Sequence, residues 1–518
     1  MLRRVSVLLV LVLLAVGLIG LAEAAPKHGG TLRFAMHSNV KNLEPWVAVG
    51  SITYCFQGNV YSGLVTYEPP TGEIAPELAV AWDMLDDLTY IFYLRTGVTF
   101  HSGHPFTAED VKYSLEQMTA EDSRATLKND LSIIDSIDAL GPYTVKITLK
   151  QPTGAFLSIL ASPGVPMVSK AWIEEGHDLA TEMNGTGPFE LVSFEPGVRT
   201  VLANNDDYFE KGKPYLDEII LIPYKDSSAR TNALKGGEVD FIEYVPWQDM
   251  DYFESSSDFT LAQGFNIFMF MRMNVNQAPF DNRLVREAMC YAIDREELID
   301  LAWGGRGYEI RAALMYPGTY YYSEDLERWS YNPEKAAALL KEAGYDDPSE
   351  LSFTMLTMNL TIHQDTAEII QSQLARMGID CSLEIVEPAV ATGTRYNPQG
   401  EDGYQAATDG QSFYLLEPSG YSNWFKCGAS VYANAVGFCD EELDRLLEEG
   451  FRESNPEKRK EIYRAYEERL MYLAPWAFLY WRPQGEAMAS YVKGYARFEA
   501  APIGILTTAH LEDAWLDK

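Results

Sequence analysis

The alternation of apolar and polar residues is clearest between positions 82 and 118. Residues 88–95 mix aromatic and β-branched side chains, which is typical of a partly buried strand. Further on, Val111 and Leu115 fall on one face of a helix, and Thr107 precedes them as an N-cap. The pattern predicts a turn over residues 82–87, then a strand, a second turn and a capped helix that packs against a core.

Similar periodicities predict elements along the rest of the chain. Strands are expected at 31–36, 143–149, 216–222, 268–275, 351–357, 381–386 and 474–481. Helices are expected at 229–234, 282–294, 333–343, 363–377, 440–450 and 456–471. Helices and strands alternate in the second half, so the sequence predicts an α/β fold with helices on the faces of a sheet.

The first residues have the composition of a targeting segment. Two arginines precede an apolar run over residues 5–21, and Ala22 and Ala24 suit the small-residue positions of a cleavage site. A membrane anchor is the alternative, because the run approaches the length of a spanning helix. The cleavage site favours a signal peptide over residues 1–24. No cysteine stands near it, so a lipid anchor is not predicted.

Composition limits the class of partner. The 518 residues include 75 acidic and 41 basic side chains, which give a formal net charge of −34. This charge repels nucleic acid and anionic membranes, so neither is expected to bind. Because 47% of the residues are apolar and no low-complexity tract occurs, the chain can bury more than one core. Two or three lobes are expected.

Five cysteines occur, at positions 55, 290, 381, 427 and 439. Cys427 and Cys439 enclose a short loop, and a disulfide between them would stabilise the fold by about 3 kcal/mol. Cys290 lies in a predicted helix and is expected to be a buried thiol. The pairing of Cys55, Cys290 and Cys381 stays open.

Neither a metal nor a nucleotide cofactor is predicted. His101 and His104 have an H-x-x-H spacing, but zinc needs two further ligands and none stands nearby in the sequence. The glycine-rich segment 184–197 lacks the Gly-Lys-Ser/Thr of a phosphate-binding loop and continues as a strand.

Several separated motifs resemble one protein family. Residues 82–111 fit W-x-x-x-D-x-x-x-Y-x-F-x-L-R-x-x-V-x-F-H-x-G-x-P-F-T-A-x-D-V, which is similar to the signature of the extracytoplasmic solute-binding proteins of family 5. These proteins are the oligopeptide and dipeptide receptors of ABC importers. Further motifs follow in the family's order: Y-x-G-L-V at 61–65, G-T-G-P-F at 185–189, L-x-x-G-E-V-D at 234–240 and V-R-x-A-x-x-x-A-I-D at 285–294.

The resemblance implies a two-lobed periplasmic-binding-protein fold of type II, similar to cluster C, with a hinge between the lobes and an extra subdomain. The expected divisions are a first lobe over 25–270 with a subdomain over about 60–180, a second lobe over 271–487, and a C-terminal return to the first lobe over 488–518. The resemblance also implies a disulfide between Cys427 and Cys439, because peptide-binding relatives carry one of much the same spacing.

The same resemblance implies a role. A monomeric, periplasmic receptor without enzymatic activity would capture a peptide or similar small solute between its lobes and pass it to permease subunits in the inner membrane. Asn39 and Val40 match residues that pair with the ligand backbone in relatives, as in strand addition. Asp409 matches an aspartate that binds the ligand's ammonium group, an arrangement that compensates both charges.

Other ligands remain open. Ala406 stands where peptide receptors carry a tryptophan, and the loop 357–365 lacks the arginine of dipeptide receptors. An oligosaccharide could instead stack on Trp303 and Trp424, and Arg395 could bind an anion. Asn39 and Asp409 could equally be ordinary loop residues. A secreted glycoside hydrolase is the alternative from another class, and it would need two carboxylates about 5 to 9.5 Å apart.

Overall fold

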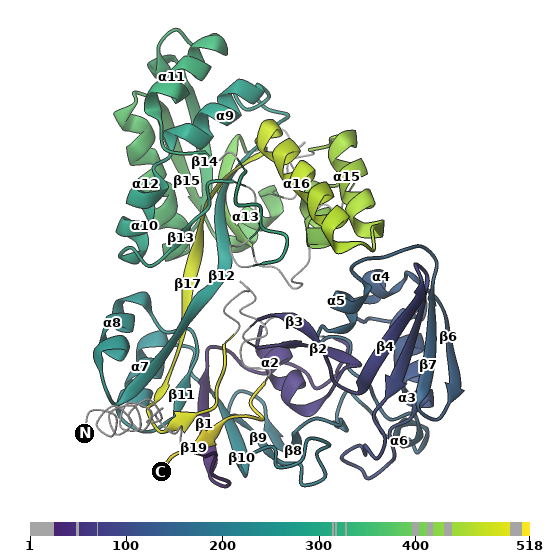
Figure 1. Cartoon of the computed structure of the whole chain (residues 1–518). Coiled ribbons are helices and arrows are strands. Elements are labelled where there is room, and N and C mark those ends of the chain that lie inside the picture. Colours follow the sequence, from purple (N-terminus) through teal and green to yellow (C-terminus); the bar gives the residue numbers. More distant parts are fainter. Residues whose placement is uncertain are drawn as a thin grey trace, which may run out of the picture.

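The computed structural model describes residues 25–47, 51–69, 71–312, 315, 319–326, 329–395, 404–411, 418–428, 438–497 and 510–518. Two lobes lie one above the other and are joined by two long antiparallel strands, β12 (Phe259–Met273) and β17 (Trp476–Ala489) (Figure 1). The expected lobe boundaries at 270/271 and 487/488 fall inside these two strands. Within the described ranges, no helix is both long enough and apolar enough to cross a membrane.

One sheet extends through both lobes because β12 and β17 contribute to each. Its order in the described part of the chain is β15-β14-β16-β12-β17-β11-β1-β10-β9-β8, with β13 added beside β17. The first-lobe strands are β1 (Thr31–Met36), β8 (Phe189–Glu195), β9 (Arg199–Asn204), β10 (Glu218–Pro223) and β11 (Phe241–Ile242). The second-lobe strands are β13 (Tyr308–Glu309), β14 (Ser352–Met358), β15 (Asp380–Val386) and β16 (Ala406–Gln411).

Strand direction differs along this sheet. β1 runs parallel to β10 and β11, and β14 runs parallel to β15 and β16. β12 is antiparallel to both β16 and β17. The crossing strands therefore connect two partly parallel α/β sheets into one.

Helices cover these sheets, and those that were predicted from the sequence have the expected bounds to within a few residues. The first lobe contains α2 (Ser51–Val60), α7 (Ser227–Lys235) and α8 (Trp247–Ser255). The second contains α9 (Arg283–Ala292), α10 (Arg295–Trp303), α11 (Pro333–Glu342), α12 (Thr361–Arg376), α13 (Pro388–Arg395), α14 (Ser422–Phe425), α15 (Glu441–Arg452) and α16 (Pro456–Leu473). Each lobe has its own buried core.

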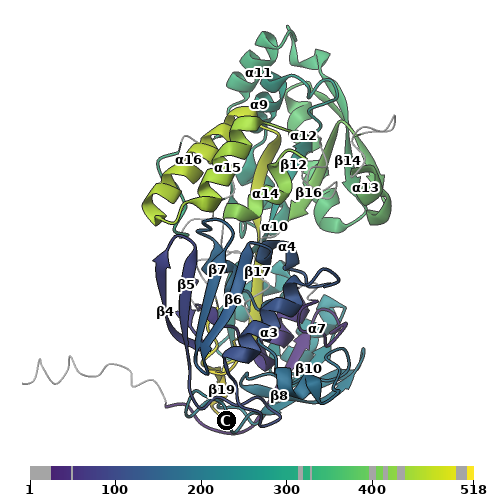
Figure 2. The same cartoon turned by 90° about the vertical axis from the view of Figure 1, so that its right-hand side faces the viewer.

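A separate four-stranded sheet forms a subdomain of the first lobe. Its strands are β4 (Ala79–Asp86), β5 (Thr89–Leu94), β7 (Thr144–Leu149) and β6 (Ile134–Gly141), in that order. Helix α3 (Ala108–Thr119) packs on it around a core distinct from those of the lobes. Figure 2 shows α15 and α16 of the second lobe above this sheet.

The elements predicted over residues 82–118 are confirmed except at one point. Strand β5 and helix α3 form as expected, and the backbone N–H of Thr107 donates to Asp110 Oδ2 at 2.8 Å to close a capping box. The predicted turn over residues 82–87 is wrong, because strand β4 continues to Asp86. Most residues of β4 are exposed, so no apolar alternation revealed the strand.

The family motifs serve packing rather than chemistry. The Nε2 of His101 lies 3.1 Å from Gly187 O, and Gly185 N donates to its Nδ1 at 3.3 Å. These partners require a neutral imidazole that donates from Nε2. A Cβ on Gly185 or Gly187 would overlap the backbone of Val60, so these two glycines allow three motif segments to meet.

The C-terminal residues lie against the first lobe. Strand β18 (Val492–Lys493) pairs with β19 (Trp515–Leu516), and Lys213 Nζ lies 2.8 Å from Asp513. Arg497 and Glu486 form a buried ion pair beside β17.

We predict that His101 contributes to acid sensitivity. Burial lowers its pKa to about 4, below its usual value of 6.5, so the unfolded state takes up a proton first as the pH falls. The stability that His101 gives is present above about pH 6.5 and lost towards pH 4, by about 2 to 3 kcal/mol. Urea unfolding at pH 7 and 4.5 should show a smaller pH dependence in His101→Gln than in the wild type.

His104→Gln is the matched control, because His104 lies in the same turn but pairs with a carboxylate, that of Glu175, at 3.3 Å. If His101→Gln and the wild type lose equal stability between the two pH values, His101 does not titrate with folding.

Candidate functional site

Asp409 lies on β16 and is almost fully buried. The antiparallel pairing of β16 with β12 places Arg272 beside it. Arg272 Nε donates to Asp409 Oδ2 at 3.0 Å, and Nη2 lies 2.7 Å from the same oxygen. The two side chains are 0% and 2% exposed, so each charge is compensated inside the second lobe.

An aromatic cluster surrounds this ion pair. The guanidinium carbon of Arg272 lies 4.8 Å from the ring centroid of Trp476, which stacks on Phe270 at 3.9 Å. Trp424 is 4% exposed and lies 6.4 Å from Trp476, ring centre to ring centre. The structure therefore brings Asp409 and Trp424 to one aromatic cluster, with Trp424 in the core of the second lobe.

Trp303 ends α10 where the two lobes meet. A Cβ on the next residue, Gly304, would lie 2.7 Å from the ring of Trp247 in α8, so glycine is required for this approach. Arg306 then donates to Glu254 of α8 at 2.7 Å. Arg395 is the last residue of α13, and its side chain lies outside the described residues.

Asn39 and Val40 follow β1 in the first lobe. Val40 is buried in that lobe's core, and Asn39 is partly exposed. They lie beyond the carboxyl end of β1, which is parallel to β11. In open α/β sheets this edge is where ligands bind.

A fixed polar surface forms at the same edge. Glu243 accepts from the backbone N–H of His37 at 2.8 Å and lies 2.6 Å from its Nδ1. The ring of His37 lies 4.3 Å from that of Tyr244. The buried Arg230 donates to the carbonyl oxygens of Tyr224, Glu243 and Tyr244 at 2.7, 2.8 and 2.9 Å, which holds these residues in place.

The lobes also meet on the side away from the crossing strands. A cavity of about 270 Å³ is lined by residues of the subdomain and of the second lobe: Asn129, Asp130, Ile133, Gln151, Ser419, Lys426, Leu447, Glu448, Phe451 and Arg452. Beside it, Gly154 N donates to Phe451 O at 2.9 Å. A Cβ on Gly154 would overlap Glu453 O. The described arrangement thus depends on glycine at this contact.

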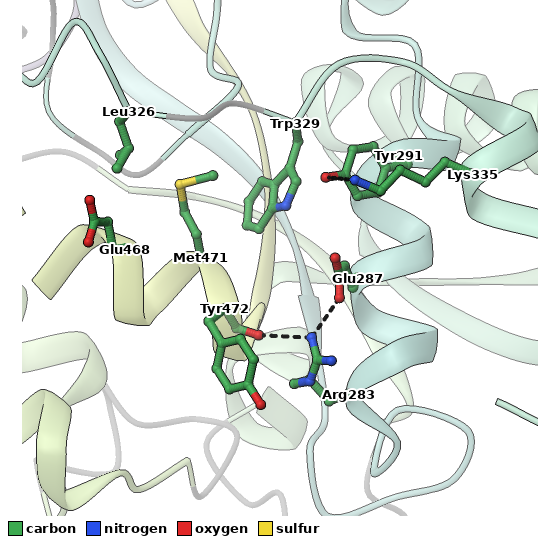
Figure 3. A pocket seen from close by; sticks show the side chains of 9 residues that line it. All are labelled: Arg283, Glu287, Tyr291, Leu326, Trp329, Lys335, Glu468, Met471 and Tyr472. Atoms are coloured by element: carbon green, nitrogen blue, oxygen red, sulfur yellow. Dashed lines mark hydrogen bonds and ion pairs between the residues drawn. The ribbon is translucent and has the colours of Figure 1, made fainter. Parts of the chain in front are cut away.

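A second cavity, of about 360 Å³, lies within the second lobe between α9, α16 and the start of α11 (Figure 3). It is lined by Arg283, Glu287, Tyr291, Leu326, Trp329, Lys335, Glu468, Met471 and Tyr472. Arg283 donates to Glu287 at 2.6 Å, and Lys335 donates to the Tyr291 hydroxyl at 2.6 Å. Glu468 pairs at 3.3 Å with Arg464, which lies outside the lining, and the lining includes none of the residues that the sequence analysis selected.

The five cysteines form one disulfide and three buried thiols. The structure joins Cys427 to Cys439 by a disulfide and leaves Cys55, Cys290 and Cys381 as buried thiols. Burial raises the pKa of Cys290 to about 12. The described ranges contain no group of three or more His, Cys, Asp or Glu side chains suited to hold a metal ion.

Comparison with known proteins identifies the family. The model of the bacterial extracellular solute-binding proteins, family 5 Middle, matches residues 73–432, which is more than half of the chain. The chain belongs to this family. It is therefore a receptor of the two-lobed type that binds a solute for an ABC importer, and the resemblance noted in its motifs is confirmed.

Family 5 relatives match nearly the whole chain. The glutathione-binding protein GsiB of Escherichia coli O1:K1 is 30% identical over 454 residues, covering 85% of this chain and 87% of its own. AgaA of A. tumefaciens R10, solved with agropinic acid, is 30% identical with a TM-score of 0.77, covering 94% of this chain and 99% of its own. DppA of Helicobacter pylori, solved with the peptide STSA, is 27% identical with a TM-score of 0.77, covering 95% and 99%.

Several residues at the candidate site of this family 5 receptor were not selected by the sequence analysis. Arg272 was missed because its partner Asp409 is 137 positions away. His37, Glu243 and Tyr244 each follow a short strand, and that position at a strand end was the signal that could have selected them. Nothing in the sequence around Gly154 indicated an interlobe contact.

We predict that Gly154→Ala separates the subdomain from the second lobe, because the added methyl group overlaps the backbone of Glu453. Small-angle X-ray scattering should show a larger radius of gyration than in the wild type. Gly141→Ala is the matched control, since a Cβ there meets nothing within 4 Å. Equal radii for all three proteins would contradict the prediction.

We also predict that Asp409→Ala destabilises the fold by about 3 to 5 kcal/mol, because it leaves Arg272 buried without a counter-charge. The double variant Arg272→Met/Asp409→Leu should recover most of this loss in urea unfolding. Asp138→Ala breaks the exposed pair with Lys146 and should change stability by less than about 1 kcal/mol. A single variant at Asp409 as stable as the wild type would contradict the prediction.

Proposed function

We propose that this family 5 receptor binds a short peptide, with glutathione as the first candidate, and delivers it to the permease of an ABC importer. The observation that carries the proposal is the similarity to GsiB, which extends over 85% of this chain and 87% of the relative. The similarity to DppA, solved with a tetrapeptide, supports the same ligand class.

The charges around the crossing strands support a polar, charged solute. Glutathione is a tripeptide with two carboxylates and one ammonium group. Next to the crossing strands lie His37 with Glu243, at the edge of the first lobe, and Arg482 in β17. Such groups suit a ligand that carries charges of both signs.

An opine-type acid is the second candidate. AgaA, at 30% identity over 94% of this chain, was solved with agropinic acid. The named relatives favour neither the oligosaccharide nor the glycoside hydrolase alternative, and they are named as binding proteins.

We further propose that the protein is exported by its first 24 residues and acts in the periplasm as a monomer without catalysing a reaction. The charged start, apolar run and small-residue cleavage site support export. The relatives' names as periplasmic or extracellular binding proteins support the compartment.

A thermal-shift panel tests the ligand. Glutathione, trialanine, agropinic acid and maltotriose are added to protein that has been unfolded and refolded to remove bound solute. Glutathione at 100 times its dissociation constant should stabilise the folded state by about 2.7 kcal/mol, because it binds only that state. If maltotriose alone raises the unfolding temperature, the peptide proposal is wrong, and turnover of a glycoside would contradict a purely binding role.

A further inference from the structure

Arg482 lies in β17 between the parts of the strand that belong to each lobe. Towards the first lobe, Ala487 and Met488 pair with β11. Towards the second lobe, Tyr480 and Trp481 pair with β13. Arg482 itself is opposite Ile267 of β12, next to a shift in the strand register. A side chain here is close to both lobes.

Tyr244 of the first lobe is held beside Arg482 in an unusual backbone conformation. Its φ is +51°, in the left-handed region, which costs a residue with a side chain about 1 to 2 kcal/mol. The three bonds from Arg230 maintain this conformation, and the ring centroid of Tyr244 lies 5.9 Å from the guanidinium carbon of Arg482. Strain of this kind clusters at active sites, ligand clamps and switch regions.

Tyr480 flanks Arg482 on the second-lobe side. Its hydroxyl lies 2.8 Å from Thr366 Oγ1 in α12, which fixes the ring. Burial lowers the pKa of Arg482, while Tyr244 and Tyr480 raise it. A guanidinium stays charged under these conditions. Because water competes less in such surroundings, a carboxylate bound there would form a strong, two-pronged contact.

We propose that Arg482 binds a carboxylate of the solute between Tyr244 and Tyr480, so that this receptor selects anionic solutes. The inference rests on the proposed function and goes beyond it by naming the chemical group recognised and the residue that recognises it. Tyr244 acts as the first-lobe wall of the same subsite.

Calorimetric titration with glutathione and with glutathione diethyl ester, in which both carboxylates are blocked, tests the proposal. The wild type should bind glutathione at least 30-fold more tightly than the diester. Arg482→Gln should reduce this ratio of affinities at least 10-fold, chiefly by weakening the binding of glutathione. The ratio for Arg482→Lys should lie between those of the wild type and Arg482→Gln. Unfolding temperatures of all variants show whether the fold is retained.

Tyr244→Gly gives a second, independent test. Glycine adopts the left-handed conformation without strain, so the variant should be as stable as the wild type while it binds glutathione at least 5-fold more weakly. Tyr244→Phe keeps the ring and should bind normally.

The outcomes separate the two proposals. If Arg482→Gln prefers glutathione to the diester as strongly as the wild type does, the inference is overturned and the ligand proposal stands. If the wild type binds a neutral solute in preference to glutathione and the other acids, both are overturned.

Discussion

The pairing of β12 with β17 is the constraint on which the rest of the structure depends. Because these strands continue from one lobe into the other, both lobes share one sheet. A buried ion pair lies near each end: Arg272 with Asp409 in the second lobe, and Arg497 with Glu486 in the first. A slip of one residue would turn the side chains of a strand to the opposite face and leave these charges buried alone. The first pair therefore fixes the register of β12 with β16, and the second ties the C-terminal segment to β17, even where they add little net stability.

Between these fixed ends the pairing is irregular. The register shifts between Phe265 and Ile267 and again between Met269 and Phe270. Such bulges bend and twist a strand, so relative motion of the lobes is expected to concentrate there. The contact of Gly154 with Phe451 joins the subdomain to the second lobe, so a rotation that separates the lobes breaks it. A solute can shift the equilibrium between open and closed arrangements of the lobes only through contacts that improve when the lobes approach.

Features that depend on neighbouring residues, such as strand bounds and helix caps, were predicted correctly from the sequence. Strand β1 has the expected bounds, and Thr107 caps α3 as expected. Both predictions succeed because alternation and capping depend only on residues that are close in the sequence. Strand β12 was expected from 268 but begins at Phe259, because Gly264 and the bulges interrupt its apolar pattern. That glycine is explained by Arg497, whose guanidinium occupies the place of a side chain. The partners in the site were not predictable, since Asp409 and Arg272 meet only through the pairing of distant strands.

Charge compensation decides how a zwitterionic solute can be oriented. Asp409 Oδ2 already accepts from Arg272, and Oδ1 accepts from Gly410 N at 2.8 Å. An ammonium group that reached this carboxylate would lie close to a guanidinium of like charge in poorly screened surroundings, which is strongly unfavourable. At Arg482 a carboxylate would instead meet a charge of opposite sign, which lies against the ring of Tyr244. The net charge of −34 repels an anion at long range, but salt screens that repulsion beyond about 8 Å and leaves a buried contact unaffected. Under the proposal for Arg482, the anionic end of the solute therefore lies at the crossing strands, and groups other than the Asp409 carboxylate select its other end.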